Sequence, residues 1–503
     1  MYFNVTNRID VKTSAIELAE VKRLTMFDYL KKVKQSDKFS SCIVELDENY
    51  AHHDLEQKFG FKDRIINLFE YFQGLKPQSI KKEKALINRI FLHQSYHFKN
   101  RDNLVDIYES QDGRITLGCL KDRVYYADYK DSWGFLDRRE FYKNGVLSHT
   151  HVFDDKYRVV CKEYYDNNGK PKLTLYYRGS SDTETVLTLI YLVTNNGLKV
   201  FNSMNELIAY FFKQLAEQKP NSTFLFDRSI PILDAIQLEQ IPAKKIFVFH
   251  SRYKDEHGKI MPVYQNIANQ IKNNSLDELI VSTNKEKADI VKLAKIASTK
   301  INVIPVTYIE DVVPKDYAQR DKNKLILVSR VSEEKRVIDA IRAVIKLKKQ
   351  FHNIYLDIWG YGDDYNGNQY LDEVKDLIDN QNASKYIRLK GYSHNLTKEY
   401  DTAAIQLLTS KYEGFSMSLL EGQSHGVPAV SYDVEYGPSD IIEQNRSGFL
   451  VKAGSVNDLV KKIRLLLSDR DKAAEFSKQA YEASKRYSFG KIVDKWLSLE
   501  KIK

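Results

Sequence analysis

The chain has 503 residues, of which 43% are hydrophobic and 12% are aromatic. At roughly 150 residues per domain this length indicates about three domains, and the apolar content excludes a wholly disordered chain. The 77 basic and 68 acidic residues leave a net charge of +9, which suits an anionic ligand such as a nucleotide or an acidic polymer; a basic surface without such a ligand explains it equally well.

The cysteines and the N-terminal residues indicate the cellular compartment in which we expect the protein. Cys42, Cys119 and Cys161 show no CxxC spacing, so we expect neither a disulfide framework nor a zinc ribbon, and a reducing cytosol fits them. The first ten residues contain no apolar signal region, and no run approaches 18 apolar residues. We therefore expect a cytoplasmic protein without a membrane span. Nucleic acid has no motif support.

Residues 1–75 predict the opening of an α/β domain. A short apolar strand at the N-terminus is followed by helical periodicity from Ser14 to Leu30, and then by a second strand at Ser41–Leu46.

Residues 100–200 predict an antiparallel β-meander with almost no helix. Tyrosine and phenylalanine alternate with charged residues, as in a sheet with one solvent-exposed face. Turn residues separate the strand-like runs at 143–145, 154–155 and 166–169. The expected strands are Arg114–Leu120, Arg123–Tyr129, Phe135–Tyr142, Val146–Phe153, Arg158–Tyr165 and Lys172–Arg178. Because α/β patterning resumes afterwards, the meander is interpreted as an insertion.

From about residue 200 strands and helices alternate again. The expected elements are helix Ser203–Glu217 and strands Thr223–Phe226, Lys245–His250 and Glu278–Ser282. From residue 323 they are strands Lys324–Ser329, Ile354–Trp359, Tyr386–Lys390, Ile405–Thr409 and Ala429–Tyr432, helices Glu333–Lys349, Gln369–Gln381 and Ser416–Gly426, and a final helical stretch Val456–Lys503. Such alternation predicts a parallel, doubly wound sheet with ligands at the carboxyl ends of its strands.

These patterns predict an α/β protein with two Rossmann-like domains and an inserted meander. We expect 1–75 and 199–318 to form the first Rossmann-like domain, 76–198 the meander, and 319–485 the second Rossmann-like domain. Residues 486–503 are expected to form a C-terminal helix that returns to the first domain.

The segment 412–421, YEGFSMSLLE, carries the densest chemistry. Glu413 follows a strand, Gly414 lets backbone approach a ligand, and Ser416 is expected to cap the next helix. The free N–H groups of Ser416, Met417 and Ser418 would then form an anion site. Glu421 could accept hydrogen bonds from vicinal hydroxyls, as on a ribose. Taken alone, an ordinary capped helix with two solvated glutamates is the more common explanation.

Two further segments and one histidine are candidates for ligand contacts. Arg330 and Lys335, in the segment SRVSEEKR that begins at Ser329, lie five residues apart across a strand-to-helix turn and could both contact a diphosphate. Residues 436–440, YGPSD, predict a tight turn with Ser439 as the cap of a helix at 440–444. His250 ends an apolar strand. A solvated helix start, a plain turn and a structural histidine are the alternatives.

Other signatures are absent or weak. The sequence has no P-loop, HExxH or GxSxG motif, and the GYG at 360–362 is a common chance match. Asp363 and Asp364 do not stand in a convincing DxD context, so no metal is inferred.

Taken in order, the strand-end histidine, SR…K, EGF…E and YGPSD segments resemble retaining glycosyltransferases of the two-Rossmann GT-B fold. The EGFSMSLLE segment matches that family's E-x7-E motif, most specifically within 320–455. The inserted meander and YGPSD resemble a bacterial subgroup. It comprises GlcNAc transferases acting on Ser-rich and Ser-Asp-repeat adhesins and transferases that glycosylate wall teichoic acid.

The resemblance implies a role for each matching position. Arg330 and Lys335 would hold the donor diphosphate and Glu421 the ribose. Glu413 and the backbone of Gly414, Phe415 and Ser416 would hold the sugar, with His250 beside sugar and acceptor. Backbone at Lys390, Gly391 and Tyr392 would face the uracil. Ser14, Ala15 and Ile16 stand where relatives carry a Gly-containing turn near the phosphates, and Ala15 departs from that glycine. Ser416 replaces a glycine that is common in relatives.

The resemblance also implies a metal-free reaction without a cofactor, in which UDP-GlcNAc is the donor substrate. Cationic side chains and a helix N-terminus would stabilise the leaving diphosphate, and front-face attack would retain configuration. We favour Ser hydroxyls of an acidic repeat protein as acceptors, because residues 14–19 resemble the adhesin-modifying branch. Wall teichoic acid is the first alternative, and a non-catalytic glycosyltransferase-like chaperone is the second. Such chaperones tend to lose the E-x7-E and SR…K groups, which this chain keeps.

The meander is the expected site of assembly. A large sheet with aromatic faces can pair with a second copy or grip an extended acceptor, so we expect a homo-oligomer formed through 76–198. Strands such as 123–130, rich in tyrosine and basic residues, would face the acidic polymer. Peripheral contact with a membrane is compatible with this organisation.

Overall fold

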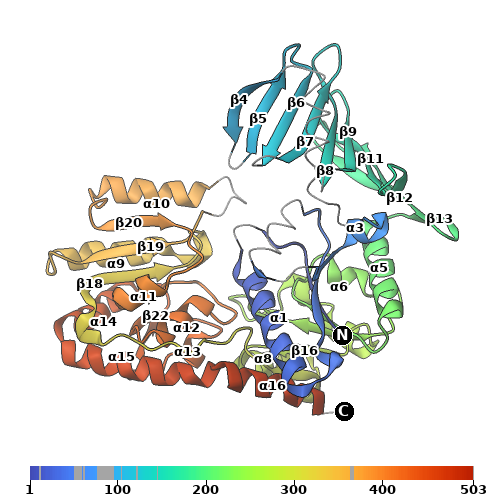
Figure 1. The fold of residues 1–503 in the computed structure, drawn as a ribbon. Coiled ribbons are helices and arrows are strands. Elements are labelled where there is room, and N and C mark those ends of the chain that lie inside the picture. Colours follow the sequence, from blue (N-terminus) through green and yellow to red (C-terminus); the bar gives the residue numbers. More distant parts are fainter. Residues whose placement is uncertain are drawn as a thin grey trace. The chain divides into compact units, whose positions relative to one another are not determined.

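The computed structural model describes residues 1–10, 13–49, 59–60, 63–75, 96–102, 105–120, 123–143, 146–362 and 368–501. Contacts divide the chain into two compact units (Figure 1). Unit 1 comprises Met1–Val11 and Ser40–Lys245, and unit 2 comprises Lys12–Phe39 and Ile246–Lys503. Asp363 and Asp364, from which no metal site was inferred, lie outside the described residues, as do Asn144 and Gly145 of one expected turn.

The α/β part of unit 1 is a small parallel sheet. Its strands β1 (Tyr2–Thr6), β2 (Ser41–Glu45), β3 (Ile65–Asn67) and β14 (Thr223–Phe226) lie in the order β14-β1-β2-β3. All residues of β1 and β2 are buried, as expected for parallel strands covered on both faces. The described residues of this part include the helices α3 (Leu68–Gln73), α5 (Met204–Gln218), which begins after the capping residue Ser203, and α6 (Ile232–Ala235).

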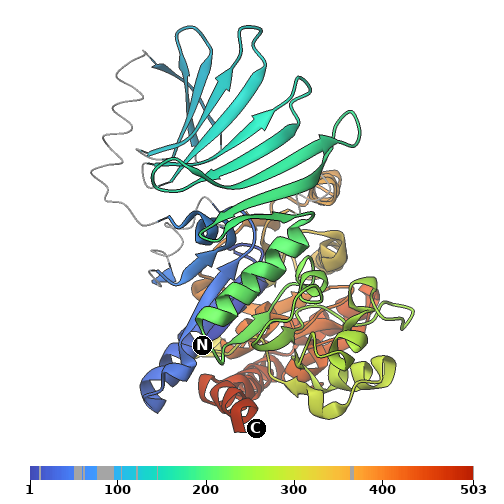
Figure 2. The same ribbon diagram turned by 90° about the vertical axis from the view of Figure 1, so that its right-hand side faces the viewer.

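The rest of unit 1 is a ten-stranded antiparallel sheet with its strands in chain order, so the predicted meander is observed (Figure 2). The six expected strands are present, with each end within one residue of its expected position: β6 (Ile115–Leu120), β7 (Arg123–Lys130), β8 (Leu136–Lys143), β9 (Val146–Phe153), β10 (Val159–Tyr165) and β11 (Pro171–Gly179).

Four strands of this sheet were not expected. They are β4 (Tyr96–Asp102), β5 (Val105–Ser110), β12 (Thr185–Thr194) and β13 (Gly197–Phe201). Strands β4 and β13 are the two edges of the sheet. The sequence of β4, YHFKNRD, lacks apolar alternation because an edge strand can carry charged side chains that the core of a sheet excludes.

Unit 2 begins with α1 (Ala15–Lys34), which packs against α16 (Phe489–Lys501) through the rings of Phe27 and Trp496, 5.3 Å apart. Strands β15 (Lys244–Val248), β16 (Glu278–Val281) and β17 (Ile301–Val303) pair in parallel. Helices α7 (Ile267–Lys272) and α8 (Asn284–Ala294) connect them.

The C-terminal sheet of unit 2 has six parallel strands in the order β20-β19-β18-β21-β22-β23. They are β18 (Asp321–Val328), β19 (Tyr355–Trp359), β20 (Ile387–Gly391), β21 (Ala403–Leu408), β22 (Ala429–Asp433) and β23 (Gly448–Lys452). Chain order reverses between the neighbours β18 and β21, which makes their carboxyl ends the topological switch point of a doubly wound sheet. The predicted doubly wound sheet is therefore confirmed.

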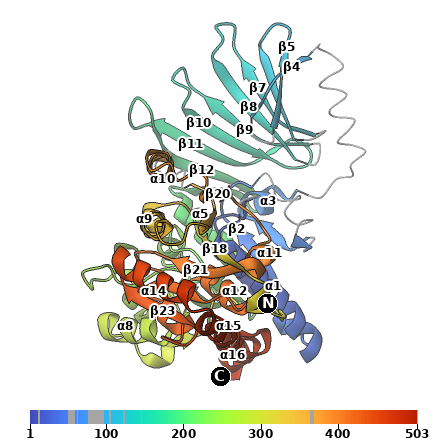
Figure 3. The ribbon, with the colours of Figure 1, turned by 90° about the vertical axis from the view of Figure 1, so that its left-hand side faces the viewer.

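Helices cover both faces of this sheet (Figure 3). Helices α9 (Val337–Lys348), α10 (Gln369–Asn380) and α14 (Val456–Ser468) lie on one face, and α11 (Thr397–Thr402) and α12 (Met417–Ser424) lie on the other. The expected final stretch Val456–Lys503 is not one helix, because α14, α15 (Arg470–Ser484) and α16 divide it. Among the described residues, no helix combines the length and apolar character needed to cross a bilayer.

Candidate active site

The switch point of the C-terminal sheet brings two of the predicted motifs together. Strands β18 and β21 pair directly, with Leu327 opposite Leu407. The SR…K segment follows β18, and the segment beginning at Tyr412 follows β21. Because parallel strands end at the same edge of a sheet, both motifs lie where ligands of such sheets bind.

An ion pair joins these two motifs. The Nζ atom of Lys335 lies 2.9 Å from Oε1 of Glu413, and both side chains are largely buried. The hydroxyl of Ser410 donates to the same carboxylate oxygen at 2.6 Å. Arg330 instead pairs with Glu334, whose carboxylate also accepts a hydrogen bond from the hydroxyl of Tyr412. The joint role of Arg330 and Lys335 toward one anion stays a prediction.

The backbone around Glu413 and Phe415 is packed too closely for a side chain at Gly414 or at Gly437. A β-carbon built on Gly414 would stand 2.2 Å from the carbonyl oxygen of His250. Gly437 has a φ of +97°, and a β-carbon there would stand 2.0 Å from the carbonyl oxygen of Phe415. Two backbone hydrogen bonds join Glu413 to residues 435 and 436. The YGPSD turn therefore supports the Glu413 loop directly.

Two capping predictions need correction. Ser416 is the N-terminal flanking residue of α12, but its side chain makes no capping hydrogen bond. Its φ of +76° is a conformation that favours glycine, and within the described part of the chain its buried hydroxyl has no partner. Ser439 is not a cap: α13 (Pro438–Ile441) begins after Gly437, because the proline occupies the first helical position.

The start of α12 contributes Phe415, Met417, Ser418 and Glu421. The ring of Phe415 packs against Tyr487, Met417 is buried, and the carbonyl of Ser418 accepts hydrogen bonds from neighbouring side chains. The Oε2 atom of Glu421 accepts a hydrogen bond from the hydroxyl of Tyr400 at 3.4 Å.

Burial sets the acidity of Glu421. Desolvation raises the pKa of this carboxyl, while the charge of Lys22, on α1, lowers it. Sequence reasoning missed Lys22, because its proximity to α12 arises between helices far apart in the chain.

The predicted N-terminal loop and the end of β20 also meet. The hydroxyl of Tyr392 donates to the carbonyl of Thr13 at 3.1 Å. Ser14 caps α1 and forms a capping box with Glu17, so Ala15 and Ile16 are its first helical residues. The ammonium of Lys390 lies 5.5 Å from the ring centroid of Trp359, and the carbonyl of Gly391 accepts a hydrogen bond from the N–H of Gly360. The hydrogen bond between Tyr392 and Thr13 therefore brings the segment predicted to border the uracil next to the segment predicted to lie near the phosphates.

The loop after β15 contains the predicted His250 and adds Arg252 and Lys254, which the sequence did not single out. His250 stands two residues past the end of the strand. The guanidinium carbon of Arg252 lies 3.9 Å from the ring centroid of Tyr412, the residue before Glu413. The Nζ atom of Lys254 lies 2.8 Å from Asp289 and 2.9 Å from Glu435. The only sequence signal for the stacking of Arg252 was a weak one, the presence of Tyr412 directly before Glu413.

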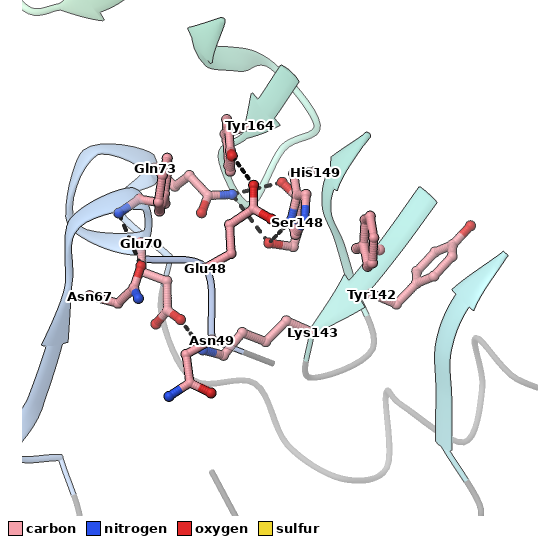
Figure 4. A pocket seen from close by; sticks show the side chains of 12 residues that line it. Glu48, Asn49, Asn67, Glu70, Gln73, Tyr142, Lys143, Ser148, His149 and Tyr164 are labelled. Atoms are coloured by element: carbon pink, nitrogen blue, oxygen red, sulfur yellow. Dashed lines mark hydrogen bonds and ion pairs between the residues drawn. The ribbon is translucent and has the colours of Figure 1, made fainter. Parts of the chain in front are cut away.

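A second polar cluster lies in unit 1, beside a small cavity of about 30 Å³ (Figure 4). One ligand-type atom from each of Glu48, His149 and His151 lies within 4.8 Å of the others, which is compatible with a metal site by residue type. However, Oε1 of Glu48 is already 3.0 Å from the ammonium of Lys162 and accepts from the hydroxyl of Tyr164. A divalent ion would have to replace that ammonium, so a buried ion-pair network explains the cluster better.

Residues 309–483 match the family model described as glycosyl transferases group 1. The chain is 24% identical to a poly(glycerol-phosphate) alpha-glucosyltransferase of Bacillus subtilis, over 90% of this chain and 67% of that protein. It is 25% identical to a poly(ribitol-phosphate) alpha-N-acetylglucosaminyltransferase of Staphylococcus aureus, over 88% of both chains. It is also 25% identical to the GtfA subunit of a UDP-N-acetylglucosamine–peptide N-acetylglucosaminyltransferase of Streptococcus pneumoniae, over 98% of this chain and 97% of that protein.

Solved structures show the same fold. Pneumococcal O-GlcNAc transferase GtfA in complex with UDP and GlcNAc superposes with a TM-score of 0.82 at 22% identity, covering 99% of this chain and 98% of that one. TarM of S. aureus superposes with a TM-score of 0.78 at 22% identity, covering 99% of both chains. A GtfA/B complex superposes with a TM-score of 0.76 at 22% identity, also covering 99% of both chains. The predicted GT-B fold and the family resemblance are confirmed.

Proposed function

We propose that this chain, whose residues 309–483 match the group 1 glycosyltransferases, moves GlcNAc from UDP-GlcNAc to Ser hydroxyls of Ser-Asp or Ser-rich repeat proteins, with retention and without a metal. The observation that carries the proposal is the Lys335–Glu413 pair at the switch point of the C-terminal sheet. It combines a cation suited to a leaving diphosphate with a carboxylate suited to sugar hydroxyls, on the two strands that border the expected ligand site.

The donor end of the site follows from the same geometry. Lys335 and Arg330 would hold the diphosphate, assisted by the N-terminus of α12, where the helix dipole favours negative charge. Glu421 would accept hydrogen bonds from the ribose. Tyr392 and the Lys390–Gly391 backbone would border the uracil, beside the capped N-terminus of α1.

Transfer needs one bond to form and one to break. The Ser oxygen would bond to the anomeric carbon as the bond from that carbon to the UDP oxygen breaks. The departing phosphate would take the hydroxyl proton, and Lys335 with Arg330 would stabilise the charge on the leaving group. Attack on the face that UDP leaves retains configuration and needs no enzyme nucleophile.

The protein acceptor is favoured by how the relatives align. GtfA subunits match over 97% or 98% of their own length, whereas the polyol-phosphate transferases match over 67% and 88%. Those same polyol-phosphate relatives support the second candidate function, transfer to wall teichoic acid.

One experiment separates these functions. UDP release from UDP-GlcNAc is measured alone, with a Ser-Asp repeat peptide and with purified poly(ribitol phosphate), each with and without EDTA. The proposal expects release driven by the peptide and unaffected by EDTA, with an α-linked product by NMR. Release driven by the polyol alone supports the second candidate, and absence of transfer to either acceptor supports the non-catalytic chaperone.

We also propose that the meander forms the contact between copies of the chain. Its edge strand β13 exposes Leu198 and Val200, and the neighbouring β12 exposes Val186 and Val193. An exposed apolar edge is suited to pairing. Replacing Leu198 and Val200 by serine should reduce the mass measured by light scattering while leaving UDP affinity intact; an unchanged mass would place the contact elsewhere.

A further inference from the structure

The loop that follows β15 is held rigidly on two sides. The carbonyl of His250 occupies the space beside Gly414, where a side chain would clash. Tyr253 is fully buried, and Lys254 bridges the carboxylates of Asp289 and Glu435. Arg252 lies between these anchors, so its backbone is fixed beside the Glu413 loop.

Among the described residues, the guanidinium of Arg252 has an aromatic partner but no anionic one. It stacks on the ring of Tyr412 at 3.9 Å. Within the described part of the chain, its buried Nε has no hydrogen-bond partner and no carboxylate forms an ion pair with it. By contrast, Arg330 and Lys335 each already pair with a glutamate.

An arginine that stacks on an aromatic ring and lacks an anionic partner is suited to bind an anion. Stacking on the face of the Tyr412 ring leaves the N–H donors, which lie in the plane of the guanidinium, directed away from that ring. A partly buried charge without an anionic partner is unfavourable, so binding of a matching group recovers free energy. The planar fork fits a carboxylate with two parallel hydrogen bonds.

The position of Arg252 indicates which substrate supplies this anion. Tyr412 separates it from the diphosphate residues, because the ring contacts Arg252 while the hydroxyl contacts Glu334, the partner of Arg330. Arg252 shares its loop with His250, the residue expected beside sugar and acceptor. The anion is therefore on the acceptor side of the site.

We infer that Arg252 is an acceptor-binding residue that takes the carboxylate of the aspartate next to the accepting serine. The inference rests on the proposed function, since it assumes an acidic repeat protein as the acceptor. It adds a specificity element to that function: the chain would select serines that have an acidic neighbour.

The test compares Ser-Asp and Ser-Asn repeat peptides, which differ in charge but little in shape. For Arg252→Gln we expect the KM for the Ser-Asp peptide to rise about tenfold or more, since a charge-assisted contact is lost. The KM for the Ser-Asn peptide and the affinity for UDP should stay within about twofold of the parent. Arg252→Lys should give an intermediate KM that rises with salt, because it keeps charge without the planar fork. Arg342→Gln, at an exposed arginine of α9, is the matched control and should behave as the parent.

Several results would overturn the inference. An equal rise in KM for both peptides in Arg252→Gln would show a general structural role. Weaker UDP binding by this variant would show that Arg252 contacts the donor substrate instead of the acceptor. Weaker binding of poly(ribitol phosphate) with unchanged Ser-Asp binding would make the anion a phosphate. Peptide affinity measured by fluorescence polarisation reads the Arg252 contact without turnover. If the parent binds the Ser-Asp peptide through Arg252 yet transfers no sugar, the proposed function fails while the Arg252 assignment stands.

Discussion

The carbonyl oxygen of His250 lies 2.2 Å from the point where a β-carbon on residue 414 would stand. The two residues come from different motifs, one after β15 and the other after β21. Their contact joins the expected acceptor-side histidine to the loop of Glu413, and it requires glycine because the obstacle is backbone that cannot rotate away.

Gly414→Ala should therefore lower both stability and turnover. Forcing the two backbones apart costs about 1–3 kcal/mol in comparable overpacked sites. It also displaces Glu413 relative to His250. Thermal unfolding and UDP-GlcNAc turnover report the two effects. Gly490→Ala is the control, because a β-carbon there meets nothing within 4 Å. Parent-like values for Gly414→Ala would show that the loop tolerates the shift.

Lys335→Ala and Arg330→Ala should each weaken UDP binding. Loss of a charge-assisted contact costs about 1.5–3 kcal/mol, and Lys335→Ala also leaves the largely buried Glu413 without its cation. Calorimetric titration with UDP measures the affinity. Lys346→Ala is the control: this exposed lysine of α9 contacts Asn457. Unchanged affinity in both site variants would remove the diphosphate assignment.

Glu413→Gln and Glu421→Gln should fail in different ways. Glu413 would contact the transferred sugar, whose charge changes toward the transition state, so its replacement should lower kcat about a hundredfold. Glu421 would contact the ribose equally in both states, so its replacement should raise the donor KM about tenfold with little change in kcat. Steady-state kinetics with varied UDP-GlcNAc separates the parameters, and the division is wrong if both variants alter both parameters alike.

His149 should make unit 1 sensitive to acid. Burial lowers the pKa of His149 from 6.5 to about 3; the charge of Glu48 raises it, and those of His151, Lys162 and Lys143 lower it further. Because the pKa is lower in the folded state, the stability it contributes is complete above pH 6.5 and is lost as pH falls toward 3.

His149→Phe should therefore weaken the pH dependence of unfolding. The new ring can stack between Phe141 and Tyr164, as the imidazole does. We expect the variant to lose about 2 kcal/mol less unfolding free energy than the parent between pH 7 and pH 4.5. Denaturation by urea at several pH values measures this. His257→Phe, at an exposed histidine, should follow the parent, and identical pH profiles for all three proteins would contradict the assignment.

Local patterns were sufficient for much of the architecture. The six expected meander strands and the parallel C-terminal sheet were predicted because apolar period and turn residues act over a few positions. The unexpected edge strand β4 shows the limit of such patterns. Strand β4 pairs along its backbone with β5 although its side chains are mostly polar, and backbone pairing leaves no periodic signal.

The sequence by itself determined which residue types follow β18 and β21, and hence that cations and carboxylates stand at the carboxyl edge of the C-terminal sheet. Tertiary structure alone decided their partners: Lys335 with Glu413, Arg330 with Glu334, Arg252 on Tyr412 and Lys22 near Glu421. It also decided that the residue before α12, Ser416, adopts a positive φ instead of capping the helix. The reason is that a motif consists of residues close together in the sequence. These pairings instead depend on how segments separated by up to hundreds of residues pack against one another.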